Sequence, residues 1–370
     1  NRTYVERWPP VHLLNNMLLK AVTILFSCFL KRSITYNFRF DYTIIDGHTK
    51  KIYNTEEITV VSHTTAGVMI KNEYIPTLSC KIFNVKSDVS YITFDNCGIN
   101  RIEEKCFSQK IENITSMIII TNNQLRSIKT RTFSNLKVLS ISLTNNQIEV
   151  IEDGSFHNLT LLKELNLSFN RLHTLNSKAF VNLFNFRTLH LESNRITSLQ
   201  KESLVFFREG DSRLNIKCNE VTYLDKDFLG GMTAPKLHLN LYNNRLVSLP
   251  EGIFDYHYFI QIDVSRNPLT KVSKYFCSRN CTVETLSFGC EGMSEESVRE
   301  SVQNIENWVD EMGDKVTTLL TDGYCAFKKN NTKIVRDPRS PSMCSGGKNT
   351  EEIDFWVYFK IFMIMYIMWM

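Results

Sequence analysis

A pattern of apolar and polar positions recurs along the middle of the chain, from Val89 to Val272. Each copy reads apolar, any, apolar, any, any, Asn, any, apolar, and the clearest copies are "LNLSFNRL", "LHLESNRI" and "LNLYNNRL". The gaps between successive copies are 26, 23, 24, 24, 25, 25 and 23 residues. The Asn position, taken once by Cys, falls at Cys97, Asn123, Asn146, Asn170, Asn194, Asn219, Asn244 and Asn267. This spacing indicates a stack of similar structural units.

Repeats of this length and pattern predict an α/β leucine-rich repeat solenoid, a horseshoe of about eight repeats with cysteine-containing caps at both ends. In each repeat the two apolar strand positions should point inward and the residues between them outward. Strands of successive repeats should then stack in parallel and line a concave surface. The Asn amide both donates and accepts hydrogen bonds, so we expect it to satisfy backbone groups where the chain leaves the strand.

A large apolar residue follows the Asn of most repeats by nine or ten positions, and we expect it to fill the core behind the strands. These residues are Phe107, Phe133, Phe156, Phe180, Leu204, Phe228 and Phe254. They and the inward-facing Leu and Asn residues are interpreted as scaffold without a binding function.

Function should lie in the outward strand positions, which the scaffold leaves free to vary. Aromatic and charged residues are the types that anchor interfaces. The ligand-binding candidates are therefore Phe169, His190, Glu192, Lys217, Tyr242, Asp263 and Arg266. Ordinary solvated sheet residues are the alternative interpretation of each. Cys218 also faces outward in this register, where it would either pair with another chain or remain free.

Cysteines flank the repeats at both ends. Cys80 and Cys106 lie on either side of the first repeat and could staple an amino-terminal cap over its open apolar end. Cys97 occupies an Asn position, so we expect a buried thiol that bonds backbone groups. Cys277, Cys281, Cys290 and Cys325 follow the last repeat and predict a disulfide-bonded cap whose connectivity stays open. A zinc site is the alternative for these four residues.

A helix is predicted inside the carboxyl-terminal cap. Ser294 provides helix-start chemistry, and Val298, Val302, Ile305 and Val309 follow at helical spacing. We expect this helix to pack on the cap.

Asn-x-Ser/Thr sequons at Asn113, Asn158, Asn166, Asn280 and Asn330 predict glycosylation of a secreted protein. Asn158 should lie on a back-side loop. Asn166 lies on a predicted strand, so a glycan there would block the middle of the concave face.

The amino end predicts entry into the secretory pathway. Met17 is followed by a basic residue and an apolar run from Ala21 to Leu30. This run is too short to span a bilayer and is typical of a signal peptide, which we place at residues 17–33. A short signal anchor is the alternative. Residues 1–16 are interpreted as a non-native upstream segment.

The carboxyl end predicts attachment to a membrane. Ser345 and Gly346 begin a triplet of small residues, and a polar spacer and an apolar run at 355–370 follow. This layout resembles a glycosylphosphatidylinositol attachment signal, with Ser345 and Gly346 as candidate anchor sites. A truncated transmembrane helix is the alternative. The remaining divisions are an amino-terminal cap at 34–88, repeats at 89–276, a carboxyl-terminal cap at 277–335 and a linker at 336–354.

The charge and cysteine content restrict the class of partner and the compartment. The chain has a formal net charge of +4. Residues 1–33 contain five basic residues and one acidic residue, so the remainder is near neutral. This argues against nucleic-acid binding. Ten cysteines, together with sequons and a leader, indicate an oxidising compartment.

The sequence shows no catalytic constellation. It contains no H-E-x-x-H pattern, no Gly-rich phosphate loop and no G-x-S-x-G elbow, and its eight histidines are scattered. We therefore predict a protein that is not an enzyme and needs no cofactor or metal.

The stretch "CKIFNVKSDVSYITFDNCGINRI" resembles the amino-terminal cap of insect leucine-rich repeat proteins, in particular the mosquito leucine-rich immune proteins. The resemblance covers roughly residues 78–290. It implies a secreted or membrane-attached protein whose partner is another leucine-rich repeat protein or a complement-like thioester protein. The best-known members carry a coiled coil after the repeats. This chain has no long coil and is more similar to the coil-less members.

These observations predict an extracellular recognition protein of insect innate immunity. It would present a rigid surface to a protein or glycan ligand at the cell surface or in secreted form. A cell-adhesion or neuronal guidance protein is the alternative. A signalling co-receptor is a third interpretation.

Overall fold

The computed structural model describes residues 40–46, 49–55, 58–60, 66–85, 89–107, 114–291, 293–312, 316–321, 325 and 334–336. The chain divides into two compact units, Asn1–Arg39 and Phe40–Met370, and the described residues belong to the second. The predicted upstream segment, signal peptide, anchor site and apolar tail lie outside the described residues.

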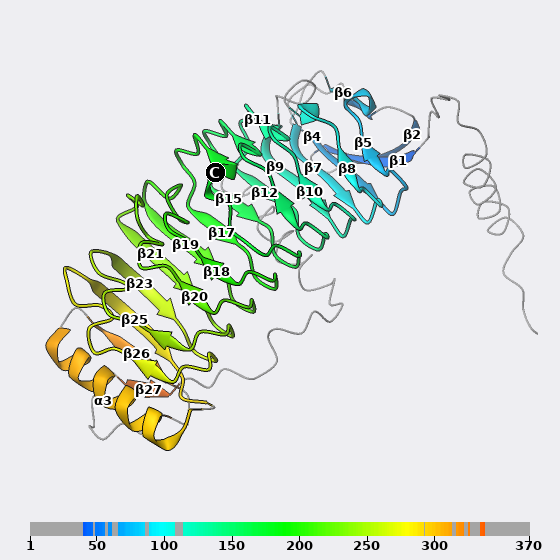
Figure 1. Ribbon diagram of the computed structural model, residues 1–370. Helices are drawn as coiled ribbons and strands as arrows, with labels where there is room; N and C mark the ends of the chain where they lie inside the picture. Colours follow the sequence, from blue (N-terminus) through cyan, green and yellow to red (C-terminus); the bar gives the residue numbers. More distant parts are fainter. Residues whose placement is uncertain are drawn as a thin grey trace, which may run out of the picture. The chain divides into compact units, whose positions relative to one another are not determined.

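A 14-stranded sheet runs along the second unit, and its strands lie side by side in nearly the order of the sequence (Figure 1). Every neighbouring pair from β4 to β27 is parallel, whereas β1 is antiparallel to both β2 and β4. The order is β2 (Thr49–Thr55), β1 (Phe40–Asp46), β4 (Ala66–Lys71), β7 (Val89–Asp95), β9 (Ile114–Thr121), β12 (Ser140–Ser142), β15 (Glu164–Asn166), β17 (Thr188–His190), β19 (Asp211–Asn215), β21 (Lys236–Asn240), β23 (Tyr258–Asp263), β25 (Thr282–Phe288), β26 (Thr318–Thr321) and β27 (Ile334–Arg336).

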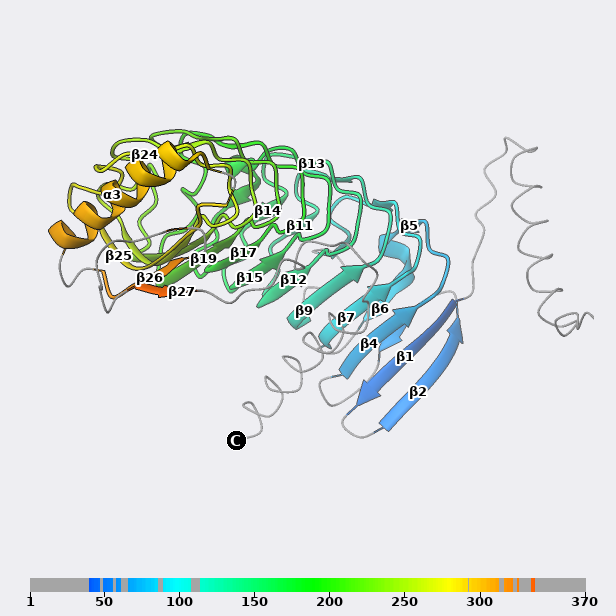
Figure 2. The ribbon, with the colours of Figure 1, turned by 90° about the horizontal axis from the view of Figure 1, so that it is seen from below.

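Short strands form the other side of each turn, and Figure 2 shows them and helix α3 opposite the sheet. They pair in parallel as β3 (Ile58–Val60) with β6 (Phe83–Val85), β5 (Thr77–Leu78) with β8 (Arg101–Ile102), β10 (Ser127–Ile128) with β13 (Val150–Ile151), β11 (Phe133–Ser134) with β14 (Phe156–His157) and β16 (Phe180–Val181), β18 (Ser198–Leu199) with β20 (Tyr223–Leu224), and β22 (Ser248–Leu249) with β24 (Lys271–Val272). Two 3₁₀ turns, η1 (Cys80–Ile82) and η2 (Ser177–Ala179), complete the connections.

The predicted Asn ladder is confirmed, and Asn170 shows how it works. Its amide donates to the carbonyls of Leu143 at 3.0 Å and Leu167 at 2.9 Å, and its oxygen accepts from the N–H of Ile148 at 3.0 Å. Each ladder residue therefore joins its own turn to the preceding one. These bonds satisfy buried backbone groups that a strand-to-loop bend would otherwise leave unpaired.

Cys97 takes the ladder position of the first repeat and is fully buried, as predicted. Its thiol bonds the carbonyls of Asp95 at 3.4 Å and Ile70 at 3.5 Å. Burial raises the pKa of this thiol to about 11. The residue is therefore a neutral structural thiol. The staple predicted between Cys80 and Cys106 stays a prediction, because the side chain of Cys80 lies outside the described residues.

The residue before each ladder position has left-handed backbone, with φ between 52° and 57°. These residues are Asn96, Asn122, Asn145, Phe169, Ser193, Cys218, Asn243 and Arg266. Asn tolerates this conformation better than most residues with a Cβ. Phe169, Cys218 and Arg266 hold it at a steric cost that the repeat geometry imposes on every turn.

The predicted apolar spine fills the core behind the sheet. Phe133 stacks on Phe156 with ring centroids 5.4 Å apart, and Phe156 stacks on Phe180 at 5.6 Å. All seven predicted spine residues are buried. The distance between stacked rings is close to the distance between adjacent strands. One aromatic residue per turn therefore fits this position.

The sheet extends beyond the predicted repeats at both ends. Strand β4 forms a turn before the first repeat, and Asn72 after it adopts the same positive φ of 59°. Strands β25, β26 and β27 continue the sheet through the carboxyl-terminal cap. The array therefore has about nine turns, where the sequence pattern showed eight.

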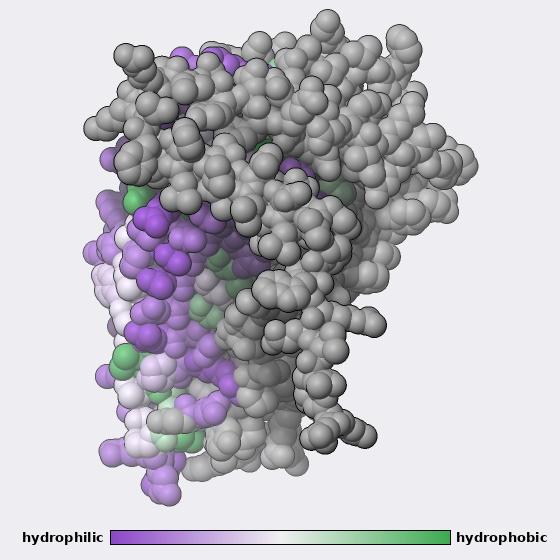
Figure 3. Space-filling model, turned by 90° about the vertical axis from the view of Figure 1, so that its right-hand side faces the viewer, coloured by the Kyte–Doolittle hydropathy of each residue, from purple (hydrophilic) through white to green (hydrophobic). Residues whose placement is uncertain are grey.

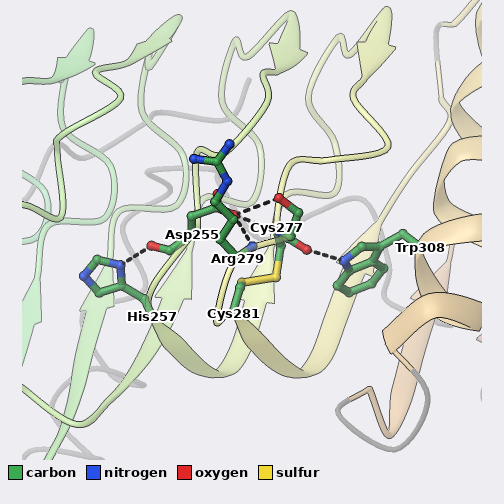
Figure 4. The surroundings of a disulfide bond; sticks show 7 residues. Asp255, His257, Cys277, Arg279, Cys281 and Trp308 are labelled. Atoms are coloured by element: carbon green, nitrogen blue, oxygen red, sulfur yellow. Dashed lines mark hydrogen bonds between the residues drawn. A yellow bond between two sulfur atoms is a disulfide. The ribbon is translucent and has the colours of Figure 1, made fainter.

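Disulfides join the four cap cysteines as Cys277–Cys281 and Cys290–Cys325. These two bonds establish the connectivity that the sequence left open. They also exclude the zinc alternative, because all four thiols are used in disulfides. In Figure 4 the first disulfide lies beside Trp308, whose indole donates to the carbonyl of Cys277 at 2.9 Å.

The predicted cap helix is α3 (Glu295–Met312). Ser294 caps its amino end by accepting a bond from the N–H of Ser297 at 3.2 Å. Val302, Ile305 and Val309 are buried, as the spacing predicted. The helix therefore covers the last apolar turn, as a terminal cap must.

Candidate functional site

The outward-facing side of the 14-stranded sheet, here called the sheet face, displays side chains in regular rows. Strand register places Glu164 beside Thr188, then Arg213, His238 and Gln261. A second row contains Asn166, His190, Asn215, Asn240 and Asp263. Side chains that are about 24 residues apart in sequence therefore become immediate neighbours.

The central cluster consists of Glu192, Asn215 and Lys217. The Glu192 carboxylate accepts from the Asn215 amide at 2.8 Å and lies 3.3 Å from the Lys217 ammonium. The Glu192 and Lys217 side chains are about a quarter exposed, at 22% and 24%. Two predicted candidates thus meet across neighbouring turns and hold each other in place, which reduces the entropy that a ligand contact would cost.

A second cluster contains Tyr242 and Arg266. The Arg266 guanidinium lies 6.0 Å from the Tyr242 ring centroid and 3.9 Å from the carboxylate of Glu291. An aromatic ring beside a guanidinium is a common anchor for protein ligands. Together the two clusters bring four of the seven predicted residues together on four successive turns.

The remaining candidates occupy separate places on the same face. His190 lies 3.4 Å from the Glu164 carboxylate. Phe169 is half-buried at the edge of the face. Asp263 is buried, and its carboxylate accepts from the N–H and hydroxyl of Ser265. Asp263 therefore stabilises its own turn and is poorly placed to contact a ligand directly.

The prediction missed the residues immediately before the first inward leucine of each repeat. Among them are Glu164, Arg213 and His238, which also point outward because side chains alternate along a strand. Burial lowers the pKa of His238, and the neighbouring positive charge of Arg213 lowers it further. Extending the period-two pattern one residue towards the amino end of each strand would have found this row.

Another missed group lies near the starts of strands β21, β23 and β25. Tyr258 donates its hydroxyl proton to Glu284, and Lys236 lies 3.8 Å from the same carboxylate and 4.6 Å from the Tyr258 ring. The hydrogen bond to Glu284 raises the pKa of Tyr258. No repeat pattern pointed to these residues, because Lys236 and Tyr258 lie ahead of the motif in their turns and Glu284 lies beyond the last repeat.

The sequons that the structure describes differ in their surroundings. Asn166 is half-buried on the sheet face and accepts from the N–H of Ser168 at 3.0 Å. Asn158 lies off this face, on the turn side, and donates to Asn135 at 2.8 Å. Asn280 is exposed inside the Cys277–Cys281 loop. Asn113 and Asn330 lie outside the described residues.

An apolar cluster occupies the sheet face at its amino-terminal end. It consists of Tyr91, Met117 and Ile119, all less than 10% exposed, and it is separate from the main core. The Tyr91 ring covers Gly67, where an added Cβ would lie 2.2 Å from ring atom Cζ. A larger residue at position 67 would therefore have to displace this ring.

Cys218 is disulfide-bonded. The alternative of a free outward thiol is therefore wrong, and the alternative of a bond to a second chain is not needed.

Large exposed apolar side chains are scattered over the surface. They are Tyr74, Val150, Leu161, Phe184, Tyr223, Val247, Tyr256 and Tyr275. Figure 3 shows one side of the molecule, on which the described residues are mainly hydrophilic and the hydrophobic ones form small patches. Isolated apolar residues are normal on a protein surface. The sheet face therefore remains the best candidate site.

The described part of the chain contains neither a candidate metal cluster nor a helix that could span a membrane. No group of three or more potential ligands is placed to hold a metal ion there. Likewise, no helix among those residues is long and apolar enough to cross a bilayer. His257, which bonds the carbonyl of Asp255 at 2.8 Å (Figure 4), belongs to a loop outside the sheet face.

Comparisons with known proteins point to the repeat. Residues 112–172 and 138–196 match the family model described as leucine rich repeat, and no enzymatic family was found. No curated protein matches the chain. A solved structure of the Toll–Spätzle complex of Drosophila is similar, with 15% identity and a TM-score of 0.35 over 60% of this chain and 43% of that chain. The repeat matches and the stacked parallel strands show a parallel β-solenoid of the leucine-rich repeat type, with about nine turns and a disulfide-bonded region at its carboxyl end.

Proposed function

We propose that this protein is an extracellular recognition module that binds a protein or glycan ligand through the sheet face and performs no catalysis. The observation that carries the proposal is the pair of clusters formed by Glu192, Asn215 and Lys217 and by Tyr242 and Arg266. They present charged and amide groups on a rigid scaffold, with the buried Tyr242 ring beside Arg266. Rigid presentation lowers the ordering cost of binding.

The disulfides support an extracellular setting, because such bonds persist in oxidising compartments. Membrane attachment through a lipid at Ser345 or Gly346 is part of the proposal. Treatment of expressing cells with a phosphatidylinositol-specific phospholipase should release the protein into the medium. Retention of the protein on the cells would count against the anchor.

A role in insect innate immunity is the finer part of the proposal. It is supported by the resemblance of residues 80–102 to the cap of mosquito leucine-rich immune proteins, whose partners include leucine-rich repeat and thioester proteins. Expression that rises after infection would support this role. Aggregation of beads coated with the protein would instead favour the adhesion alternative.

The binding test compares two sheet-face variants with a control variant that removes the same charge elsewhere. Partners captured by the purified protein from haemolymph or cell surfaces should bind Lys217→Ala and Arg266→Ala variants about tenfold or more weakly, since a central contact contributes at least about 1.4 kcal/mol. Lys129→Ala is the control, because Lys129 pairs with Glu152 at 2.6 Å away from the sheet face. Equal losses in all three variants would contradict binding through the sheet face.

A further inference from the structure

We propose that Lys163, Arg187 and Arg213 form a binding row for a linear sulfated polysaccharide, at the edge of the sheet where its strands begin. Lys163 and Arg187 directly precede strands β15 and β17, and Arg213 lies in β19. Lys217 and Arg266 lie beyond the other ends of β19 and β23. The row is therefore a second surface, and it can bind whether or not the clusters on the sheet face have a ligand.

The three residues are neighbours on successive turns, and all three are exposed. The N–H of Arg187 donates to the carbonyl of Lys163 at 3.0 Å, and the N–H of Arg213 donates to the carbonyl of Arg187 at 2.6 Å. Strands β15, β17 and β19 lie side by side in the sheet (Figure 1). At about 4.8 Å per strand, the three backbone positions cover about 10 Å along the sheet. The result is a short line of cations with the spacing of the strands.

None of these three cations forms an ion pair with a carboxylate of the described residues. The carboxylate of Glu164, next to Lys163 in the chain, lies 3.4 Å from His190 instead. Other basic residues on or beside the sheet face do have such partners, namely Lys71 with Asp95, Lys217 with Glu192, Lys236 with Glu284 and Arg266 with Glu291. Like charges on neighbouring strands repel each other. A polyanion from outside the protein would remove this repulsion by neutralising all three charges.

Gly210 holds the central cation of the row in place. A Cβ at Gly210 would lie 2.9 Å from both Cζ and Nε of Arg187. The guanidinium of Arg187 therefore lies directly on the backbone that leads into β19, the strand of Arg213. The φ of Gly210 is +66°, a conformation that residues with a Cβ rarely adopt. Because this packing fixes Arg187 before a ligand arrives, it lowers the ordering cost of binding.

The chemistry of the row fits sulfate groups on a linear chain. Arginine presents several N–H donors in a fixed plane, which suits the oxygens of tetrahedral anions. Three cations in a line match a polymer whose anionic groups also follow a line, and basic clusters of this kind are typical of heparin-binding patches. A membrane surface generally requires about four to eight clustered basic residues, which is more than the row contains. The disulfides fit an oxidising, extracellular setting, where sulfated polysaccharides occur.

Calorimetric titration of the full chain with heparin tests the row. A variant with Lys163→Ala, Arg187→Ala and Arg213→Ala should bind heparin about tenfold or more weakly than the parent. The slope of log affinity against log salt concentration should also become smaller by about 2 to 3, because three fewer cations release counterions.

The control variant removes three positive charges from the opposite edge of the sheet, through Arg171→Ala, Arg195→Ala and Arg245→Ala. These residues directly follow ladder residues, and Arg171 and Arg245 lie 3.8 and 2.9 Å from the carboxylates of Glu149 and Glu220. The control should keep the parental affinity and salt slope. Equal losses in the two variants would overturn the proposal, because net charge and not the row would then decide binding.

Two further probes decide which anion the row recognises. Chemically desulfated heparin should bind the parent much more weakly than heparin, because the groups that the row contacts are gone. Vesicles of phosphatidylserine and phosphatidylcholine should not bind at the same salt concentration. Equal affinity for heparin and its desulfated form, or binding to the vesicles without binding to heparin, would overturn the sulfated polysaccharide as the ligand.

A Gly210→Ala variant keeps all three charges and tests their positioning. Its new Cβ would displace the guanidinium of Arg187, so heparin binding should weaken by about twofold or more. In an Arg187→Ala background the same substitution should have little further effect, since the displaced group is absent. Equal weakening in both backgrounds, or no weakening in the parent, would overturn the proposed arrangement of the row.

Discussion

Strands β7 and β9 and the central strands β15 to β21 belong to one sheet, yet they present different chemistry on the same face. On β7 and β9 the outward residues Tyr91, Met117 and Ile119 pack on one another as an apolar cluster. On the central turns Glu192 and Lys217 bind each other across adjacent turns. Both regions consist of parallel strands of one sheet, so the outward side chains decide what each region can bind.

The inward side of the two regions also differs in one position. The central turn has Asn170, whose amide makes bonds to three backbone groups of two turns. The amino-terminal turn has Cys97, whose thiol reaches two carbonyls at 3.4 and 3.5 Å. The repeat therefore tolerates a weaker ladder bond near the array end, where fewer turns depend on it.

The largest predicted effect is on the ladder. Asn170→Ala should lower the free energy of unfolding by about 2–4 kcal/mol, because it leaves several buried backbone groups unpaired. Cys97→Ala should lower it by about 1 kcal/mol, since the thiol bonds are weak. Urea unfolding followed by circular dichroism measures both. Equal losses at the two positions would show that the regions do not differ in their dependence on the ladder.

The second prediction concerns the apolar cluster. Gly67→Ala should lower the free energy of unfolding by about 1–3 kcal/mol, because the new Cβ would overlap the Tyr91 ring. In a Tyr91→Ala background the same substitution should cost less than about 0.5 kcal/mol, since the overlap is removed. A double-mutant cycle in urea measures the coupling. Additive losses would mean that the ring is not packed on Gly67.

The third prediction concerns the central ion pair. Lys217→Ala should change the free energy of unfolding by less than about 1 kcal/mol, because partly exposed pairs contribute little to stability. The same substitution should weaken ligand binding, as proposed above. Thermal unfolding beside the binding assay separates the two effects. A large loss of stability would make Lys217 a structural residue and weaken its assignment to the binding face.

The smallest effect should come from His238. Its pKa is lowered in the folded protein, so the unfolded chain binds more protons below its own pKa of about 6.5. Stability should therefore fall as the pH decreases from about 7 to 5, and His238→Asn should reduce this dependence. Melting temperatures across that range provide the measurement. The exposed His173, changed to Asn, serves as the control and should keep the parental dependence.

Much of the fold follows from the sequence because each repeat meets the same local requirements for packing and backbone hydrogen bonding. The two leucines, the Asn and the later Phe each satisfy a requirement of one turn, and every turn has the same geometry. The pattern therefore revealed the ladder, the spine and the cap helix. It did not place β4, β26 or β27 in the repeat sheet, because these strands join the sheet without carrying the complete motif.

The candidate site was predicted as a set of outward positions and not as contacts. The alternation of side chains along a strand identified Glu192, Lys217, Tyr242 and Arg266. Their pairing depends on the register between neighbouring strands. The sequence pattern of one repeat does not specify which of its residues lies beside a residue about 24 positions away. Glu164, Arg213 and His238 were missed because the search began at the first leucine of each repeat.

The sequence by itself determined the repeat, its inward residues and the separation of scaffold from outward surface, because these depend on periodicity within one turn. Tertiary structure alone decided the cysteine pairing of the cap, the engagement of Cys218 and the clustering of charges across turns. These features depend on distances between turns, which arise only when the strands stack in a particular register.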